Sequence, residues 1–261
     1  MVAMGSGIAV YALILVAFYL FQEKMIFFPG LSRFGDCQEM EKQGAQAESF
    51  GDIRYYIRKT PSPDNWIVIF HGNAGNACDR TYFTDLLSDF NSNLVVFEYP
   101  GFGRDKNKPG EPLILAKAVA LIRHIETLNP SGLPIFLMGE SLGTGVATYA
   151  ATRTKISGLI LIAAYTSLAD VAQYHYPWLP VKRLMKHRFD ASSWARQTLA
   201  PALLFHGTED DIIPIRFARE QSACFKGHAG LVEIPGAGHN DITDTGTTLI
   251  RENTRSFMMK L

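Results

Sequence analysis

A serine framed by two glycines is the residue of this chain best suited to do chemistry. Ser141 stands in the pentapeptide Gly139-Glu140-Ser141-Leu142-Gly143, after an apolar run and before a helix-compatible stretch. Strand, sharp turn and helix in this order form a nucleophile elbow, which holds the serine in strained backbone at a helix N-terminus. Glycines are needed at the flanking positions because side chains there would collide with the neighbouring strand and helix. The pattern predicts that Ser141 is a nucleophile.

Two later loops carry residue types that could activate this serine. The adjacent acids Glu209, Asp210 and Asp211 follow one strand-like run, and His239 follows the next one in a Gly-rich turn. A serine hydroxyl is a weak nucleophile until a neighbouring base takes its proton, and an acid keeps that base in the correct tautomer. His239 is the predicted base, and Asp210 or Asp211 is the predicted acid.

The chain order and an upstream loop narrow the choice of fold. Serine, acid and histidine follow one another in the order of α/β-hydrolases, whereas chymotrypsin-like and subtilisin-like enzymes use other orders. Upstream, the Gly-rich segment 71–76 follows a run typical of a buried strand, 66–70. Such a loop can turn a backbone N–H toward the serine and supply half of an oxyanion hole, which stabilises a tetrahedral intermediate.

Most of the chain alternates apolar strand-like runs with helix-like segments. This alternation indicates a mostly parallel central sheet covered by helices on both faces. The predicted class is α/β, with an α/β-hydrolase domain over residues 23–261. Strands are expected at 49–59, 66–70, 94–99, 135–138, 158–163, 202–205 and 231–234, and helices at 80–89, 111–128, 142–153, 216–225 and 246–260.

One segment, about residues 166–199, breaks this alternation. It has no run typical of a buried strand, and it contains an aromatic, proline-rich cluster. We expect a small helical cap over the active site, and a packed helical connection that touches no substrate is the alternative. Apolar side chains on such a cap would suit an acyl chain. The predicted substrate-binding residues are Tyr174, Tyr176, Trp178 and Leu179.

The N-terminal segment, residues 1–22, is predicted to anchor the protein in a membrane. It carries no charged side chain, and about 20 apolar residues suffice to cross a bilayer. The basic start and small-residue cleavage site of a secretory signal peptide are not visible. A cleaved signal and an apolar helix docked on the domain are the alternatives. Lys24, Arg33 and Lys42 favour a cytoplasmic body by the positive-inside rule, but they do not fix the side.

Composition and charge limit the partners. The chain has 261 residues, 47% of them hydrophobic, and a formal net charge of zero. Without a basic field, no nucleic-acid partner is expected. Cys37, Cys78 and Cys224 are odd in number and far apart, so we expect no disulfide framework and a small buried thiol at Cys78. They also lack the spacing of metal ligands, and we expect neither a metal nor a cofactor.

Five motifs together resemble one family, the Bem46-like serine α/β-hydrolases. They are the segments 71–76, 98–103, 139–143, 206–210 and 238–239. The family includes membrane-anchored bacterial hydrolases and, more distantly, animal protein depalmitoylases. The resemblance implies a triad of Ser141, Asp210 and His239. It also implies an oxyanion hole made by the backbone N–H groups of Asn73 and Leu142.

These expectations point to a serine hydrolase that cleaves ester or thioester bonds through an acyl-enzyme intermediate. A membrane anchor would bring it to a lipid or a lipidated protein as the acyl substrate. A non-catalytic binding or scaffold protein on the same fold is the competing hypothesis, because a fold does not fix a function.

Overall fold

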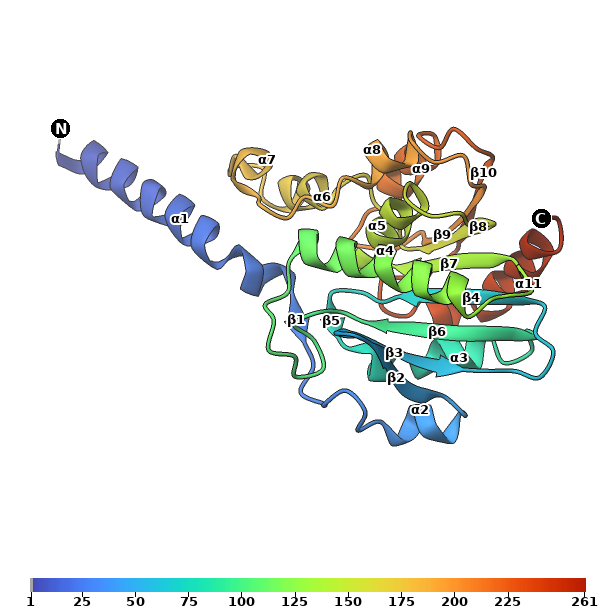
Figure 1. Cartoon of the computed structure of the whole chain (residues 1–261). Helices are drawn as coiled ribbons and strands as arrows, with labels where there is room; N and C mark the ends of the chain where they lie inside the picture. The colour runs from blue at the N-terminus through green and yellow to red at the C-terminus, as the bar shows by residue number, and fades with distance from the viewer. Residues whose placement is uncertain (1) are drawn as a thin grey trace.

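The structure, a computed structural model, describes residues 2–261, and Met1 of the predicted anchor lies outside the described residues. Within this range, eight strands form one sheet in the order β2-β3-β6-β4-β7-β8-β9-β10 (Figure 1). The hairpin of β2 (Gln46–Phe50) and β3 (Ile53–Arg58) pairs antiparallel with the rest of the sheet. The remaining strands run parallel to one another: β6 (Ser92–Glu98), β4 (Asn65–Phe70), β7 (Ile135–Glu140), β8 (Gly158–Ile162), β9 (Ala202–Gly207) and β10 (Ala229–Ile234).

Helices cover both faces of this sheet, which explains why its central strands are apolar at successive positions. Val68 and Phe70 of β4 belong to the core on one face, and Ile67 and Ile69 belong to the core on the other. The first face is covered by α4 (Glu111–Thr127), α5 (Leu142–Ala151), α8 (Ala191–Ala195) and α9 (Arg216–Ser222). The second is covered by α2 (Gln38–Lys42), α3 (Thr81–Leu86), which follows the short helix η1 (Ala77–Arg80), α10 (Ile242–Thr245) and α11 (Thr247–Met258).

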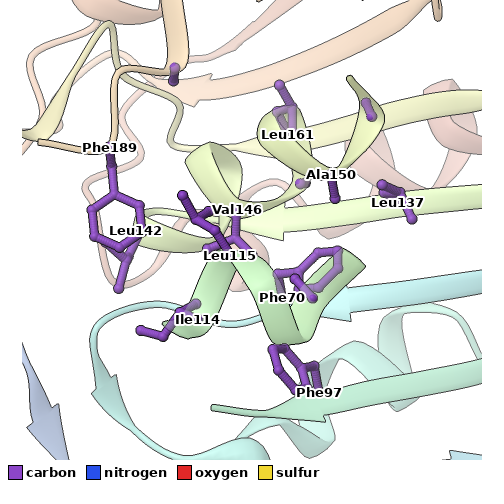
Figure 2. Close-up of a cluster of buried hydrophobic side chains, with 14 of the residues drawn as sticks. Phe70, Phe97, Ile114, Leu115, Leu137, Leu142, Val146, Ala150, Leu161 and Phe189 are labelled. Atoms are coloured by element: carbon purple, nitrogen blue, oxygen red, sulfur yellow. The ribbon is translucent and has the colours of Figure 1, made fainter. Parts of the chain in front are cut away.

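The core of the first face supports the turn that carries Ser141. Figure 2 shows Phe70 of β4 and Phe97 of β6 beneath α4 and α5, with Val146 and Ala150 of α5 facing them. Each of these four side chains is fully buried. Burial of this kind stabilises a fold by roughly 25 cal/mol per Å² of apolar surface. The packing therefore fixes the start of α5 relative to the ends of β4 and β7.

The N-terminal segment forms one long helix that projects from the body (Figure 1). In α1 (Val2–Ile26), the stretch Gly7–Ile26 is long and apolar enough to cross a membrane, judged by length and composition alone. The chain then enters β1 (Phe28–Pro29), which pairs in parallel with β5 (Ala74–Gly75). The base of α1 is therefore attached to the loop that follows β4.

Three short helices fill the segment predicted to be a cap. They are α6 (Leu168–His175), α7 (Val181–Leu184) and α8, and they lie between β8 and β9. Ser167 starts α6 by accepting a hydrogen bond from the backbone N–H of Asp170 at 2.9 Å. Figure 1 shows α6 and α7 extending from the body on the same side as α1.

The structure differs from the sequence expectations at the first strand. Residues 49–59, expected as one strand, contain the turn between β2 and β3, where Gly51 adopts φ +60°. The apolar residues Phe50 and Ile53 flank this turn and pair with each other across it. Because both arms are extended, the sequence pattern does not distinguish a hairpin from a continuous strand.

The cysteine prediction was wrong. Cys37 and Cys78 form a disulfide with a Cα–Cα distance of 5.7 Å, and Cys224 is the free cysteine among the described residues. The bond joins two segments 41 residues apart that fold against each other, so spacing along the chain gives no sign of it. Glu39 lies beside these sulfurs, and the three side chains form a group of potential metal donors. The disulfide occupies both sulfurs in this structure.

Candidate active site

Ser141 sits at the junction of β7 and α5, in the strained geometry that a nucleophile elbow requires. Its backbone adopts φ +49° and ψ −119°, a region that non-glycine residues rarely enter. A Cβ at Gly139 would overlap the backbone of Gly143, and one at Gly143 would overlap the carbonyl of Phe70. The two glycines therefore allow the close approach of β7, α5 and β4, as the sequence predicts.

The structure brings Ser141, His239 and Asp210 into one line of contacts. His239 Nε2 lies 3.1 Å from Ser141 Oγ, and its Nδ1 lies 2.7 Å from Asp210 Oδ2. His239 is held in the loop after β10, and Asp210 in the loop after β9. These are carboxyl ends of parallel strands, which meet at one edge of the sheet.

Asp210 is fixed by several donors. Its Oδ1 accepts hydrogen bonds from the backbone N–H groups of Ile212 at 3.0 Å and Ile213 at 2.7 Å. Burial alone would raise the pKa of Asp210, but the contacts from His206, His239 and Ile213 outweigh it and hold this pKa below its ordinary value. Asp210 is therefore a carboxylate over the whole physiological range. Asp211 is exposed.

His206 has a role that the sequence did not reveal. It is fully buried, with Nε2 2.6 Å from the carbonyl oxygen of Ile213 and 3.4 Å from Asp210 Oδ2. It thus packs beneath the loop that presents the acid. From the sequence alone, His206 reads as a packing residue at a strand end, and its contact with Asp210 requires the turn to fold back on β9.

The predicted oxyanion donors lie on the wall of the same cavity as Ser141. Asn73 follows β4, Leu142 opens α5, and both line that cavity. No hydrogen bond among the described residues uses the backbone N–H of either residue, so both donors are free. The side-chain amide of Asn73 donates a hydrogen bond to the backbone carbonyl of Ile26 at 2.8 Å. The backbone carbonyl of Asn73 accepts a hydrogen bond from the N–H of Phe28 at 2.9 Å. The base of α1 therefore holds this loop in place.

Contacts of Glu140 also hold the loop that follows β4. Glu140 accepts hydrogen bonds from the Tyr82 hydroxyl at 2.6 Å and from the Gly72 N–H at 3.3 Å, and it lies 3.4 Å from Arg80 Nε. Burial raises the pKa of Tyr82, and the charge of Glu140 raises it further, so the phenol keeps its proton. Neither Glu140 nor Arg80 was singled out in the sequence. Glu140 is recognisable only as the variable residue before the serine.

His71 shapes the start of this loop. It is fully buried, and its ring stacks on Tyr99 with the centroids 4.0 Å apart. Burial lowers the pKa of His71 well below its ordinary value, and the charge of Arg80 adds to this effect. A neutral imidazole that lies against Tyr99 has a packing role.

A cavity of about 830 Å³ opens beside Ser141 and His239. Its polar lining includes Arg80 at the end of η1, Glu140 at the end of β7 and Asp244 of α10. Both α1 and the cap segment contribute apolar residues to its lining. That lining includes Phe18, Met25, Leu168, Val171, Tyr176 and Met185.

The four predicted cap residues take different positions. Among the described residues that line the cavity, Tyr176 is the one member of this set. Tyr174 is 46% exposed and packs against Phe217 and Arg216, and Trp178 is 55% exposed. Leu179 is buried in the core of the first sheet face. The aromatic cluster marked the right segment, but its residues point in several directions.

The family of the chain is clear from a comparison with known proteins. The family model described as Serine aminopeptidase, S33 (Hydrolase_4) matches residues 61–195, just over half of the chain. The chain belongs to this family. The matched stretch contains Ser141 and the loop after β4, and it ends before Asp210 and His239.

Individual relatives extend over more of the chain. The uncharacterized protein Rv2307c from Mycobacterium tuberculosis is 28% identical over 247 residues, which is 90% of this chain and 87% of that protein. Lysophosphatidylserine lipase ABHD12 from Danio rerio is 26% identical over 204 residues, 68% of this chain and 53% of that protein. Among solved structures, Est1E from Butyrivibrio proteoclasticus with bound ferulic acid has a TM-score of 0.68 at 18% identity, covering 82% of this chain and 100% of that one. The predicted α/β-hydrolase fold is confirmed.

Proposed function

We propose that this protein is a serine hydrolase that cleaves carboxylic ester or thioester bonds of acyl substrates. The supporting observation is the line of contacts from Asp210 through His239 to Ser141, with separations of 2.7 and 3.1 Å. These separations lie in the range that nucleophile, base and orienting acid need. The reaction class is acyl transfer to water through an acyl-enzyme.

In the proposed mechanism, His239 Nε2 takes the proton of Ser141 Oγ as this oxygen attacks the substrate carbonyl carbon. Asp210 accepts from His239 Nδ1 and stabilises the imidazolium that forms. The N–H groups of Asn73 and Leu142 bind the negative carbonyl oxygen. His239 then returns the proton to the leaving alcohol or thiol, and water releases the acid in the reverse sequence.

The substrate class follows from the two linings of the cavity. Apolar residues from α1 and the cap suit an acyl chain, whereas the polar residues beside Ser141 suit the leaving group. A membrane location for α1, together with the Bem46-like motifs, would bring the enzyme to a lipid or a lipidated protein. The lipase among the relatives supports an acyl ester as the substrate.

Two substitutions test the triad. Ser141→Ala and His239→Ala should each lower turnover of p-nitrophenyl esters by about 10³-fold or more, and the double variant should be little worse, because triad members act as a unit. The matched control is Ser88→Ala, which removes an exposed hydroxyl. Full turnover by either purified single variant would contradict the mechanism. A wild-type protein inert toward all ester and thioester substrates would favour the scaffold hypothesis.

A further inference from the structure

One stripe of α1 faces the body of the protein. Phe18, Gln22, Met25 and Ile26 all line the cavity that contains Ser141. Their spacing of four, three and one residues places them on one face of a helix. Apart from this stripe and its extension to Leu15, most residues of α1 from Gly7 onward are exposed. The helix thus presents one face to the cavity and its remaining apolar surface outward.

A polar residue joins this stripe to the cap. Gln22 is 1% exposed, and its side-chain amide donates to the carbonyl of Leu184 at 3.2 Å. Its Oε1 accepts from the N–H of Lys186 at 2.7 Å. Hydrogen bonds to both backbone groups satisfy a side chain that would otherwise be costly to bury in an apolar helix. The cap and α1 are therefore fixed to each other beside the cavity.

Aromatic contacts continue this attachment toward the N-terminus. Phe18 meets Tyr176 edge to face with ring centroids 6.1 Å apart, and the Tyr11 hydroxyl donates to the carbonyl of Trp178 at 2.9 Å. The stretch 176–178 that makes these contacts, here called the cap tip, is exposed. It consists of Tyr176, Pro177 and Trp178.

The length of α1 sets the depth of the cap tip in a membrane. Tyr11 lies about 22 Å along the helix from Ile26, at about 1.5 Å per residue. The stretch Gly7–Ile26, which contains Tyr11, is about 30 Å long at this rise and matches a hydrocarbon layer about 30 Å thick. A helix that crosses this layer must therefore carry the cap tip into it. Lys186 of the cap lies 4.3 Å from the ring of Tyr19 and can extend toward the surface.

We infer that α1 is both the membrane segment and a wall of the acyl site, and that the cap tip dips into the bilayer beside it. The cavity then borders the hydrocarbon layer at the wall that α1 and the cap form together. The substrate is an acyl lipid of the membrane, whose chain enters sideways from the bilayer and lies along Phe18 and Met25. This inference rests on the proposed function and assigns its substrate class and route of entry.

The proposal that α1 forms a wall of the acyl site is tested with two phenylalanines of this helix. Phe18 lines the cavity, whereas Phe21 is 54% exposed. In the detergent-solubilised full chain, Phe18→Ala should lower the ratio of kcat/KM for a dodecanoyl ester to that for an acetyl ester about tenfold, because a long chain loses an apolar partner. Phe21→Ala should leave this ratio within about twofold. Equal effects of the two variants would overturn the inference. Hydrolysis of the acetyl ester and its loss in Ser141→Ala would still report separately on the proposed function.

The depth of the cap tip is tested by fluorescence. In phosphatidylcholine vesicles brominated on the acyl chains, the full chain should show a quenched tryptophan component that disappears in Trp178→Phe. Trp66 is buried in the sheet and Trp194 packs on Tyr149, so both serve as internal references. Identical quenching in the wild type and in Trp178→Phe would place the cap tip outside the hydrocarbon layer and overturn the proposed route of entry.

Discussion

Asp210 is the acid that the structure places against His239, in a run of three adjacent acids. Its Oδ1 accepts two backbone N–H groups, which leaves Oδ2 directed at the histidine. The residues alone did not decide whether Asp210 or Asp211 is the acid, and only the family resemblance favoured Asp210. The two carboxylates differ in burial because the turn after β9 points one inward and leaves the other in water.

This difference in burial predicts a large loss of activity for one amide substitution and a small one for the other. Asp210→Asn should lower kcat on the order of 10³-fold or more, because an amide favours the wrong imidazole tautomer and cannot stabilise its charge. Asp211→Asn, the matched control, should stay within about tenfold of the wild type. Steady-state kinetics of both purified variants measure this. The reverse ranking would transfer the role to Asp211.

Glu98 is a buried acid outside the mechanism. Burial raises its pKa to about 8 against the lowering effect of Arg54. Between pH 4.5 and 8, the unfolded chain has released a proton that the folded protein still holds, so the free energy of unfolding should fall as the pH rises through this window. Glu98→Gln cannot titrate and should lose this part of the pH dependence.

Melting temperatures at pH 5 and pH 8, in one detergent, measure the effect. The difference between the two pH values should shrink in Glu98→Gln and should remain in Glu252→Gln, which replaces an exposed acid. An unchanged pH dependence in Glu98→Gln would mean that Glu98 titrates normally.

Among the elements, those with local patterns were predictable and those made by distant partners were not. The runs 66–70 and 135–138 became β4 and β7 because burial on both faces demands apolar residues throughout. The pairing of β1 with β5 was not predicted, since each strand has only two residues and they are far apart in sequence. The serine and histidine were predictable because each follows a strand and sits among glycines.

The cap shows the same limit at the level of side chains. Three helices lie between β8 and β9, but sequence gives no facing direction within irregular helical segments. Tyr176 faces the cavity, whereas Tyr174 faces α9. The contribution of α1 to the cavity was also not predicted, because the apolar residues lie on every side of this helix and leave no polar face to show which side packs.

For the whole molecule, the disulfide bears on the compartment in which the body lies. Disulfides persist in oxidising compartments, so the bond between Cys37 and Cys78 favours a body outside the cytoplasm. The flanking Lys24, Arg33 and Lys42 had favoured the opposite side. A covalent bond formed within the domain is the stronger indication, because the three basic residues are few.

Thiol counting tests this assignment. In protein isolated from its native cells with thiols blocked at lysis, one cysteine, Cys224, should be alkylated under denaturing conditions, and all three should be alkylated after reduction. The variant Cys37→Ser should show two reactive thiols before reduction, because it frees Cys78. Three reactive thiols in the unreduced wild type would mean that Cys37 and Cys78 are not bonded to each other, and would indicate a body in a reducing compartment.

The central claim is that Ser141 is a nucleophile activated by His239. Its most direct test is mass spectrometry of the full chain after exposure to a fluorophosphonate, which traps an activated serine covalently. We predict a single adduct on the peptide that contains Ser141, with labelling strongly slowed in His239→Ala and absent in Ser141→Ala. An unlabelled wild type, or an adduct on another serine, would contradict the account.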